Sequence, residues 1–306
     1  MIDLTLLGCG GNMPMPNRNL SSLFVSYKGK SILFDCGEGT QIAMRKYGTG
    51  FKDLDLILIS HLHGDHVFGL PGLLSSMGNC GKTDPLYIYG PSGIQNFVEM
   101  SLNMVGNLPF EVIASDAPYQ TFRVWEHSVF KEIEIQVYSV NHSTECYAYH
   151  MHFTRTPEFS IEKAMVNNVP IKIWKKLQNE ERVKFEDKIY TSDMVLGKER
   201  NGIRLTYLTD TRYDPNYAGI VMNSDLLVCE AMYGDDSDIE KAEKNKHMIF
   251  AESAKIASEG RVKRLVLTHF SPSIERPEDY IKNATDIFEN TTIGFDGMKI
   301  KLNYCE

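Results

Sequence analysis

The sequence lacks the features that mark membrane, secreted or fibrous proteins. No run approaches the roughly 18 consecutive apolar residues of a membrane-spanning helix. The segment MIDLTLLGCGGNMP has no basic region before its apolar residues and includes Asp3, which argues against a secretion signal. No repeat of fixed period and no low-complexity tract occurs. We therefore expect a globular, cytoplasmic protein with no membrane partner.

Paired cysteines and excess positive charge are also missing. None of the six cysteines forms a C-x-x-C pair, so reduced and mostly buried thiols are predicted. The formal net charge of −8 argues against binding nucleic acid through bulk positive charge. The stretch 155–204 differs, since its 11 basic and 8 acidic residues give a local charge of +3.

The pattern of apolar residues predicts an α/β protein. Hydrophobic residues make up 42% of the chain and charged residues 24%, as in soluble enzymes. Strand-like and helix-like stretches alternate, which predicts one mixed sheet system with helices outside, in a single domain over residues 1–306. Strands are expected at 2–8, 22–27, 31–37, 54–60, 85–90, 132–140, 146–154, 203–209, 225–233, 264–270 and 298–304, and helices at 38–48, 66–78, 91–106 and 248–260. Residues 155–202 lose regular alternation and are interpreted as an inserted arm.

Histidine is concentrated where the buried strand 54–60 ends. His61, His63, Asp65 and His66 fall within six residues, and each is a type that binds borderline divalent metals. A loop at the end of a strand is fixed by the sheet and open to solvent. One or two histidines there would be an ordinary polar turn, but H-x-H-x-D-H indicates a metal site.

Further ligands are predicted at the ends of other strands. His142, Asp210 and His269 each follow a predicted strand, as the first cluster does. We expect His61, His63 and His142 to bind one ion, Asp65, His66 and His269 to bind another, and Asp210 to bridge them. Two neighbouring ions form a clamp for displacement at phosphorus or at a carbonyl. Zinc suits these ligands, with manganese or iron as alternatives.

This constellation resembles the metallo-β-lactamase superfamily, and within it most closely the ribonuclease Z family. The specific matches are Arg18-Asn19 in the first loop, FDCGEGTQ (34–41), SHLHGDHVFGLPGLL (60–74), YGPSGI (89–94) and the Asp210-Thr211-Arg212 and Thr268-His269-Phe270-Ser271 segments. The resemblance implies a four-layer αβ/βα sandwich with a protruding arm. It also implies a metal-dependent endoribonuclease that removes the 3′ trailer from precursor tRNA and acts as a homodimer.

The resemblance also implies roles for individual residues. Asp65 is expected to orient the nucleophile as well as to bind metal. Glu230 resembles the glutamate of the family's His-Glu-Ala-Thr segment and His247 the histidine of its His-Ser-Thr loop, a pair that serves the leaving oxygen. Support of a metal-bound histidine is the alternative role for Glu230. Arg18 and Asn19 are expected to hold RNA near the acceptor end.

The arm departs from the family pattern because it has no Gly-Pro pair between 168 and 177. Its lysines, Lys172, Lys175 and Lys176 among them, are candidates for distant phosphate contacts or an ordinary solvated face. Trp174 is expected to anchor the arm. This departure keeps two alternatives open: another hydrolase of the same fold, such as a general phosphodiesterase or an arylsulfatase-like enzyme, and a metal- and RNA-binding protein without catalysis.

Overall fold

The computed structural model describes residues 1–117, 122–123 and 133–304. The chain folds as two compact units, each described by itself: Met1–His152 with Arg204–Asn303, and Phe153–Ile203 with Tyr304. No helix in the described ranges is both long and apolar enough to cross a bilayer. The five described cysteines are all free thiols, and four of them are buried, as the sequence predicted.

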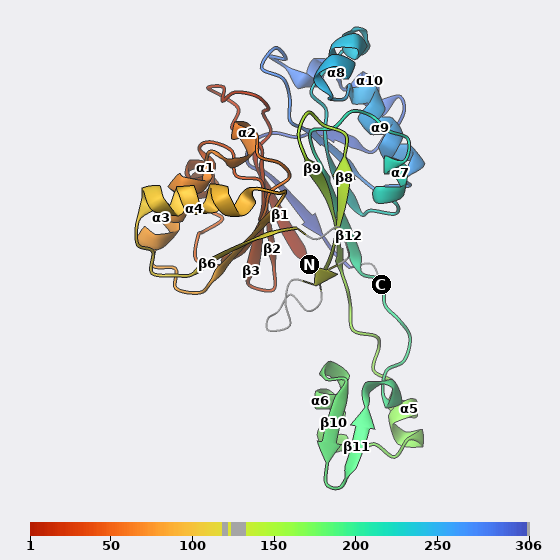
Figure 1. The fold of residues 1–306 in the computed structure, drawn as a ribbon. Helices are drawn as coiled ribbons and strands as arrows, with labels where there is room; N and C mark the ends of the chain where they lie inside the picture. Colours follow the sequence, from red (N-terminus) through yellow and green to blue (C-terminus); the bar gives the residue numbers. More distant parts are fainter. Residues whose placement is uncertain (118–121, 124–132, 305–306) are drawn as a thin grey trace. The chain divides into compact units, whose positions relative to one another are not determined.

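The first unit contains two seven-stranded sheets (Figure 1). The first has the order β16-β1-β2-β3-β4-β5-β6, and strands β3 to β6 run parallel. Its strands are β1 (Ile2–Gly8), β2 (Ser22–Tyr27), β3 (Lys30–Phe34), β4 (Leu54–Leu58), β5 (Leu86–Gly90), β6 (Val112–Asp116) and β16 (Met298–Leu302). Every residue of β4 is buried, as expected for a strand covered on both faces.

The second sheet has the order β15-β14-β13-β12-β9-β8-β7. Strands β12 to β15 are parallel, so their carboxyl ends meet at one edge. Its strands are β7 (Phe122–Arg123), β8 (Ile133–Val140), β9 (Cys146–Phe153), β12 (Ile203–Leu208), β13 (Leu226–Glu230), β14 (Leu265–Thr268) and β15 (Thr291–Ile293).

Helices cover the outer faces of both sheets (Figure 1). Those beside the first sheet are α1 (Thr40–Tyr47), α2 (Gly64–Val67), α3 (Leu70–Asn79) and α4 (Ile94–Val105). Those beside the second are α7 (Tyr217–Ile220), α8 (Ile239–Asn245), α9 (Phe250–Glu259) and α10 (Lys282–Thr285), with 3₁₀ turns η4 (Asp236–Asp238) and η5 (Pro277–Tyr280). The expected helix 66–78 is two helices, because the chain breaks at Phe68 and Gly69.

The two sheets pack face to face through aromatic residues. The rings of Phe34 and Tyr207 lie 5.0 Å apart, and the Tyr149 hydroxyl donates a hydrogen bond to the Ile59 carbonyl at 2.7 Å. All three side chains are buried. The order of layers is therefore helix, sheet, sheet, helix, as the family resemblance implied, and the packed faces fix the strand ends rigidly.

The second unit is more ordered than its sequence pattern indicated. It contains α5 (Ile161–Val166), η2 (Ile171–Ile173), α6 (Trp174–Asn179), β10 (Arg182–Phe185), β11 (Lys188–Thr191) and η3 (Ser192–Met194). Strands β10 and β11 pair as a hairpin, and Ala164, Ile173, Leu177 and Val183 belong to a small buried core. The Trp174 indole donates a hydrogen bond to the Val169 carbonyl at 2.9 Å, so this residue anchors the unit, as predicted.

Candidate metal centre and acid pair

Five predicted site residues lie just beyond the carboxyl ends of strands, and a sixth is the last residue of a strand. The loop with His61 and His63 follows β4, His142 follows β8, Asp210 follows β12 and His269 follows β14, while Glu230 is the last residue of β13. These strands belong to both sheets. The fold therefore brings together side chains that are separated by up to about two hundred positions in the sequence.

The first ligand cluster consists of His61, His63, His142 and Asp210. His61 Nε2 lies 3.0 Å from His63 Nδ1 and 3.5 Å from Asp210 Oδ2. His142 Nε2 lies 3.3 Å from His63 Nδ1 and 3.9 Å from Asp210 Oδ2. Four ligand atoms thus converge on one point, and only His63 is exposed to solvent.

The second ligand cluster consists of Asp65, His66, His269 and the same Asp210. His66 Nε2 lies 3.2 Å from His269 Nε2 and 3.3 Å from Asp210 Oδ1. His269 Nε2 lies 3.4 Å from Asp65 Oδ2 and 3.1 Å from Asp210 Oδ1. Asp210 presents Oδ2 to the first cluster and Oδ1 to the second, which is the arrangement of a bridging carboxylate.

The spacing within each cluster suits a small divalent ion. Four ligands placed tetrahedrally at about 2.0–2.1 Å from zinc would lie about 3.3 Å from one another. The distances given above range from 3.0 to 3.9 Å, and all ligand atoms of a cluster lie within 4.8 Å of one another. His66 Nε2 and His269 Nε2 face each other at 3.2 Å, where an ion would satisfy both lone pairs. The residues present therefore fit two metal ions.

Positive φ angles occur directly after three of the strands. Asp35 follows β3 with φ 54°, Asp210 follows β12 with φ 32°, and His269 follows β14 with φ 60°. A non-glycine residue in this left-handed region costs roughly 1–2 kcal/mol. Such conformations persist where the surroundings over-determine them, and they cluster at functional sites. Here they turn the carboxylates and the imidazole into the centre.

Asp35 holds the second cluster from behind. Its carboxylate accepts hydrogen bonds from Ser60 N at 2.7 Å, from Tyr207 Oη at 2.8 Å and from His66 Nδ1 at 2.8 Å. Because the carboxylate accepts a hydrogen bond from the Nδ1–H of His66, the Nε2 lone pair of this ring is free to bind the ion. Asp35 belongs to the FDCGEGTQ motif, so the sequence favours a supporting role for it at the turn. Tyr207 was missed, since no local pattern links residues 172 positions apart.

Without metal, His61 and Asp210 have the protonation states that metal binding requires, whereas His66 must lose a proton. Burial alone would lower the pKa of His66, but Asp210 and Asp35 raise it well above its usual value. Burial lowers the pKa of His61, and neighbouring His66 lowers it further, so this imidazole is neutral at physiological pH. Burial alone would raise the pKa of Asp210, but the facing His269 and His66 rings hold it well below its usual value. Neutral imidazoles and ionised carboxylates are the forms that act as ligands.

Glu230 and His247 form a buried pair beside the clusters. Glu230 Oε1 lies 3.0 Å from His247 Nδ1, and its two oxygens also accept backbone N–H bonds from Thr211, Met232 and Met248. Burial alone would lower the pKa of His247, but the Glu230 carboxylate raises it to about 9. The His247 ring lies 5.2 Å from that of His142 and 5.5 Å from that of His269. A protonated imidazole is thus held next to the centre.

Comparison with known proteins identifies the family to which the chain belongs. The chain is 51% identical over 306 residues to ribonuclease Z of Clostridioides difficile strain 630, with all of both chains covered. It is 48% identical over 308 residues to ribonuclease Z of Clostridium beijerinckii, again with full coverage. The chain belongs to the ribonuclease Z family. The resemblance drawn from the Arg18-Asn19 loop and the metal motif is therefore confirmed.

Two further comparisons bear on the ribonuclease Z fold. Human tRNase Z, short form, has a TM-score of 0.70 at 24% identity, with 98% of this chain and 99% of the human chain covered. A family model described as "Anti-Pycsar protein Apyc1" matches residues 2–169. That range ends before Asp210, Glu230, His247 and His269, so the full-length relatives carry more weight for the complete site.

The amino-terminal loop of the chain supports the second cluster. Asn12 N donates a hydrogen bond to Asp65 Oδ2 at 2.7 Å. A Cβ added at Gly11 would lie 2.5 Å from the His269 ring, so only glycine fits behind this ligand. The sequence marked this loop as a family motif but did not predict its contacts. The glycine pair at 10–11 was the available signal.

Arg18 and Asn19 are engaged with the protein itself. The Arg18 guanidinium donates to the carbonyls of Ser271 and Ile274 at 3.2 and 2.9 Å, and the Asn19 side chain donates to the Leu7 carbonyl at 3.0 Å. Arg18 thereby fixes the segment that follows His269. The structure gives both residues a positioning role, and their contact with RNA stays a prediction.

The remaining predicted residues fall into two groups. Lys172, Lys175 and Lys176 are exposed residues of the second unit. His150 and His152 lie on β9 outside the clusters, where His150 Nδ1 contacts Thr206 Oγ1 at 2.8 Å. The sequence favours the same structural role for them, because the pair does not follow a buried strand end and the predicted ligand set is complete without it. His127 lies outside the described residues.

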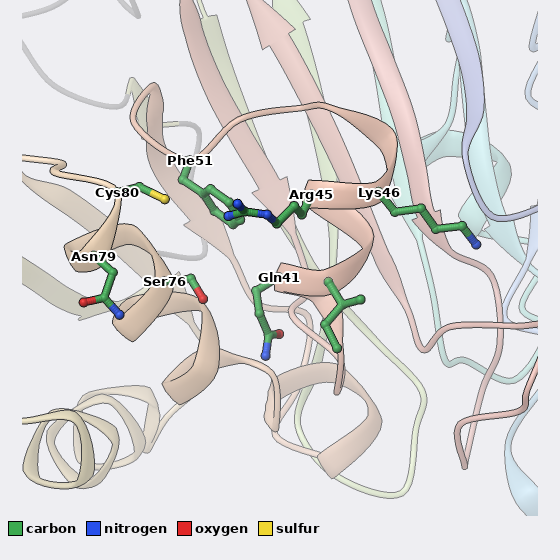
Figure 2. Close-up of a pocket in the computed structure, with 8 residues that line it drawn as sticks. Gln41, Arg45, Lys46, Phe51, Ser76, Asn79 and Cys80 are labelled. Atoms are coloured by element: carbon green, nitrogen blue, oxygen red, sulfur yellow. The ribbon is translucent and has the colours of Figure 1, made fainter.

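A separate cavity of about 540 Å³ lies beside α1 and α3 (Figure 2). Its lining includes Gln41, Arg45, Phe51, Ser76 and Asn79, and none of the metal ligands. Figure 2 shows polar side chains of different kinds around the Phe51 ring, with no convergent set of ligands or acid–base groups. The side chains that metal-assisted hydrolysis would require are therefore at the strand ends and not in this lining.

Proposed function

We propose that this chain is the endoribonuclease that removes the 3′ trailer from precursor tRNA by metal-dependent hydrolysis. The observation that best supports this proposal is that two ligand clusters share one carboxylate, that of Asp210. The Glu230–His247 pair lies beside these clusters. Two divalent ions, zinc by ligand preference, would supply an activated water and neutralise charge on the phosphate. Membership of the ribonuclease Z family directs this chemistry to tRNA.

Asp65 acts on the side of the attacking water. Burial alone would raise the pKa of Asp65, but His66 and His269 lower it far below its usual range, so the carboxylate is ionised. The Asn12 N–H and the loop before α2 fix its orientation. An ionised, oriented carboxylate can accept a hydrogen bond from the water and direct it in line toward phosphorus.

His247 acts on the side of the leaving group. Attack by water breaks the phosphorus–O3′ bond, so the trailer keeps the phosphate and the tRNA keeps the oxygen. An alkoxide is a poor leaving group and requires a proton. The Glu230 carboxylate raises the pKa of His247 to about 9, which keeps this imidazole protonated at neutral pH. His247 therefore donates the proton that yields a 3′ hydroxyl.

Substrate binding beyond the centre rests on separate residues. Lys172, Lys175 and Lys176 of the second unit would contact tRNA phosphates, which positions RNA without reading its sequence. Arg18 and Asn19 would shape the region that receives the acceptor end. The protein would work in the cytoplasm as a homodimer, as the family resemblance implies.

The test is cleavage of a 3′-extended precursor tRNA by the metal-loaded protein, with the cut mapped at nucleotide resolution. We expect one cut just after the discriminator base, a 3′ hydroxyl on the tRNA and a 5′ phosphate on the trailer. Turnover of a small phosphodiester without cleavage or inhibition by precursor tRNA would instead identify a general phosphodiesterase of this fold.

A further inference from the structure

Lys246 has an unusual backbone conformation next to the general acid. It follows α8 with φ 57° and ψ 49°, in the left-handed region that glycine or asparagine normally occupies at a helix end. Its N–H bonds to the Ala242 carbonyl, as in an ordinary helix terminus. Glycine would serve that turn without strain, so the lysine side chain itself calls for a physical explanation.

Lys246 is tied to His142 by two hydrogen bonds of opposite direction. Lys246 Nζ donates to the His142 carbonyl at 2.9 Å, and His142 Nδ1 lies 3.3 Å from the Lys246 carbonyl. A carbonyl can only accept, so Nδ1 of His142 carries the proton. The lone pair of His142 Nε2 is then directed toward His63 and Asp210 of the first ligand cluster.

His247, which follows Lys246 in the chain, is held in place by Arg212. Arg212 Nη1 donates to the His247 carbonyl at 2.9 Å, and the same guanidinium pairs with Glu252 of α9. The Arg212 N–H also bonds to the carbonyl of Asn141, the residue before His142. The segments that carry His142, Asp210 and His247 are thus linked through Lys246 and Arg212.

We propose that Lys246 is a positioning residue that couples the first ligand cluster to the general acid. The Lys246 carbonyl sets the tautomer of His142. The Lys246 ammonium holds the segment that carries His247 against the segment that carries His142. The proposal rests on the proposed function for the role of His247 as acid. The new claim is that the Lys246 side chain affects both the metal affinity of the first ligand cluster and the alignment of His247.

The experiment compares Lys246→Gly and Lys246→Met with the wild type. Glycine keeps the carbonyl and suits the left-handed turn, while methionine keeps the length of the side chain, and both remove the donor. Chelator titration should release the two ions in separate steps, and His63→Ala identifies the step that belongs to the first cluster. In both variants we expect that step to weaken by about tenfold or more.

A second readout separates coupling from simple metal loss. With saturating metal, cleavage of precursor tRNA requires a protonated leaving group, whereas hydrolysis of bis(p-nitrophenyl) phosphate hardly does. We expect kcat for the tRNA to fall about tenfold further than kcat for the activated diester. Lys28→Gly is the matched control, because Lys28 is exposed and also has a positive φ, 50°. It should leave both readouts unchanged.

Three outcomes would overturn the coupling. In the first, the chelator titration is unchanged in both variants. In the second, metal release at the first cluster is easier but kcat falls equally on the two substrates, and in the third Lys246→Gly has a defect that Lys246→Met lacks. The metal titration needs no RNA. Failure of the wild type to cut tRNA would therefore reject the proposed function, while unaltered metal steps would reject the coupling whatever the protein cleaves.

Discussion

The strand-end centre and the second unit use polar side chains in opposite ways. In the centre, His61, His66 and Asp210 are buried, and each contacts another ionisable group at 3.5 Å or less. In the second unit, Lys172 and Lys175 are exposed on a small fold stabilised by its own apolar core. Catalysis requires preorganised groups, whereas phosphate contacts require only charge on a stable platform.

The same contrast appears in the distribution of charge. Residues 155–204 carry +3, so the remainder of the chain carries −11. The two ligand clusters lie in this acidic remainder, where divalent ions would add positive charge. Substitutions in the two regions should therefore differ in kind: those in the centre should abolish chemistry on every substrate, and those in the second unit should affect tRNA alone.

The largest effect is expected for Asp210→Asn, which removes the charge shared by both clusters and keeps a residue that tolerates positive φ. Losing several kcal/mol of metal-supplied stabilisation corresponds to a drop of about 10³-fold or more in kcat. Elemental analysis should show that both ions are absent. Asp84→Ala, at an exposed carboxylate, should keep both ions. Full activity of Asp210→Asn on a small diester would contradict the shared-ligand arrangement.

His247→Gln should reduce cleavage of precursor tRNA by about 10²–10⁴-fold, the usual contribution of a general acid. The loss on bis(p-nitrophenyl) phosphate should be much smaller, since its leaving group needs little protonation.

The dependence of the tRNA cleavage rate on pH tests whether His247 donates the proton. An acid must be protonated to act, so the wild-type rate should fall as pH rises through the pKa of His247, about 9 without metal. Bound cations would lower this value. Glu230→Gln removes the carboxylate that raises the pKa and should shift the decline to lower pH than in the wild type. Identical profiles would show that the pair does not supply the proton.

Gly11→Ala should weaken the second ligand cluster without replacing a ligand. Its new methyl group would meet the His269 ring at 2.5 Å, so the ring must move. We expect affinity for one ion to fall by about 10–100-fold, measured by chelator titration. Gly219→Ala is the matched control, because nothing lies within 4 Å of a Cβ there. Equal affinities in the two variants would mean that the loop adapts freely.

The smallest effect on chemistry is expected for Lys175→Ala combined with Lys176→Ala. Each lysine–phosphate interaction lost should reduce the slope of log Kd against log salt by about 0.7–0.9, so the loss of both should reduce it by about 1.4–1.8. Binding of tRNA should therefore weaken and depend less on salt. Turnover of a small diester should not change. The exposed pair Lys299 and Lys301 of the first unit gives the control. An unchanged slope would mean that Lys175 and Lys176 are merely solvated.

The clustering of the candidate ligands could be predicted from sequence because its signal is local. H-x-H-x-D-H is contiguous, and a polar residue after an apolar strand marks a sheet edge without knowledge of the tertiary fold. Strand bounds were close for the same reason: β1 and β2 match their predicted ranges. Two predicted strands end earlier in the structure than expected. The strand predicted at 31–37 ends before Asp35, which turns with a positive φ, and the strand predicted at 225–233 ends at Glu230.

The supporting contacts could not be predicted, because they join distant segments. Tyr207 and Asp35, Gly11 and His269, and Lys246 and His142 have no common local pattern. The second unit was also harder to interpret, since short elements with few apolar residues give weak periodicity. Its hairpin had one usable cue in the Glu186-Asp187 turn, where Glu186 has a φ of 54°.

The most direct measurement of the central claim is the number of ions that the centre needs. Metal-free protein is titrated with zinc while bound metal and cleavage of precursor tRNA are followed together. The shared Asp210 predicts that activity is complete only at two ions per chain, and that Asp210→Asn abolishes both steps. Full activity at one ion per chain, or two ions bound normally by Asp210→Asn, would contradict the account.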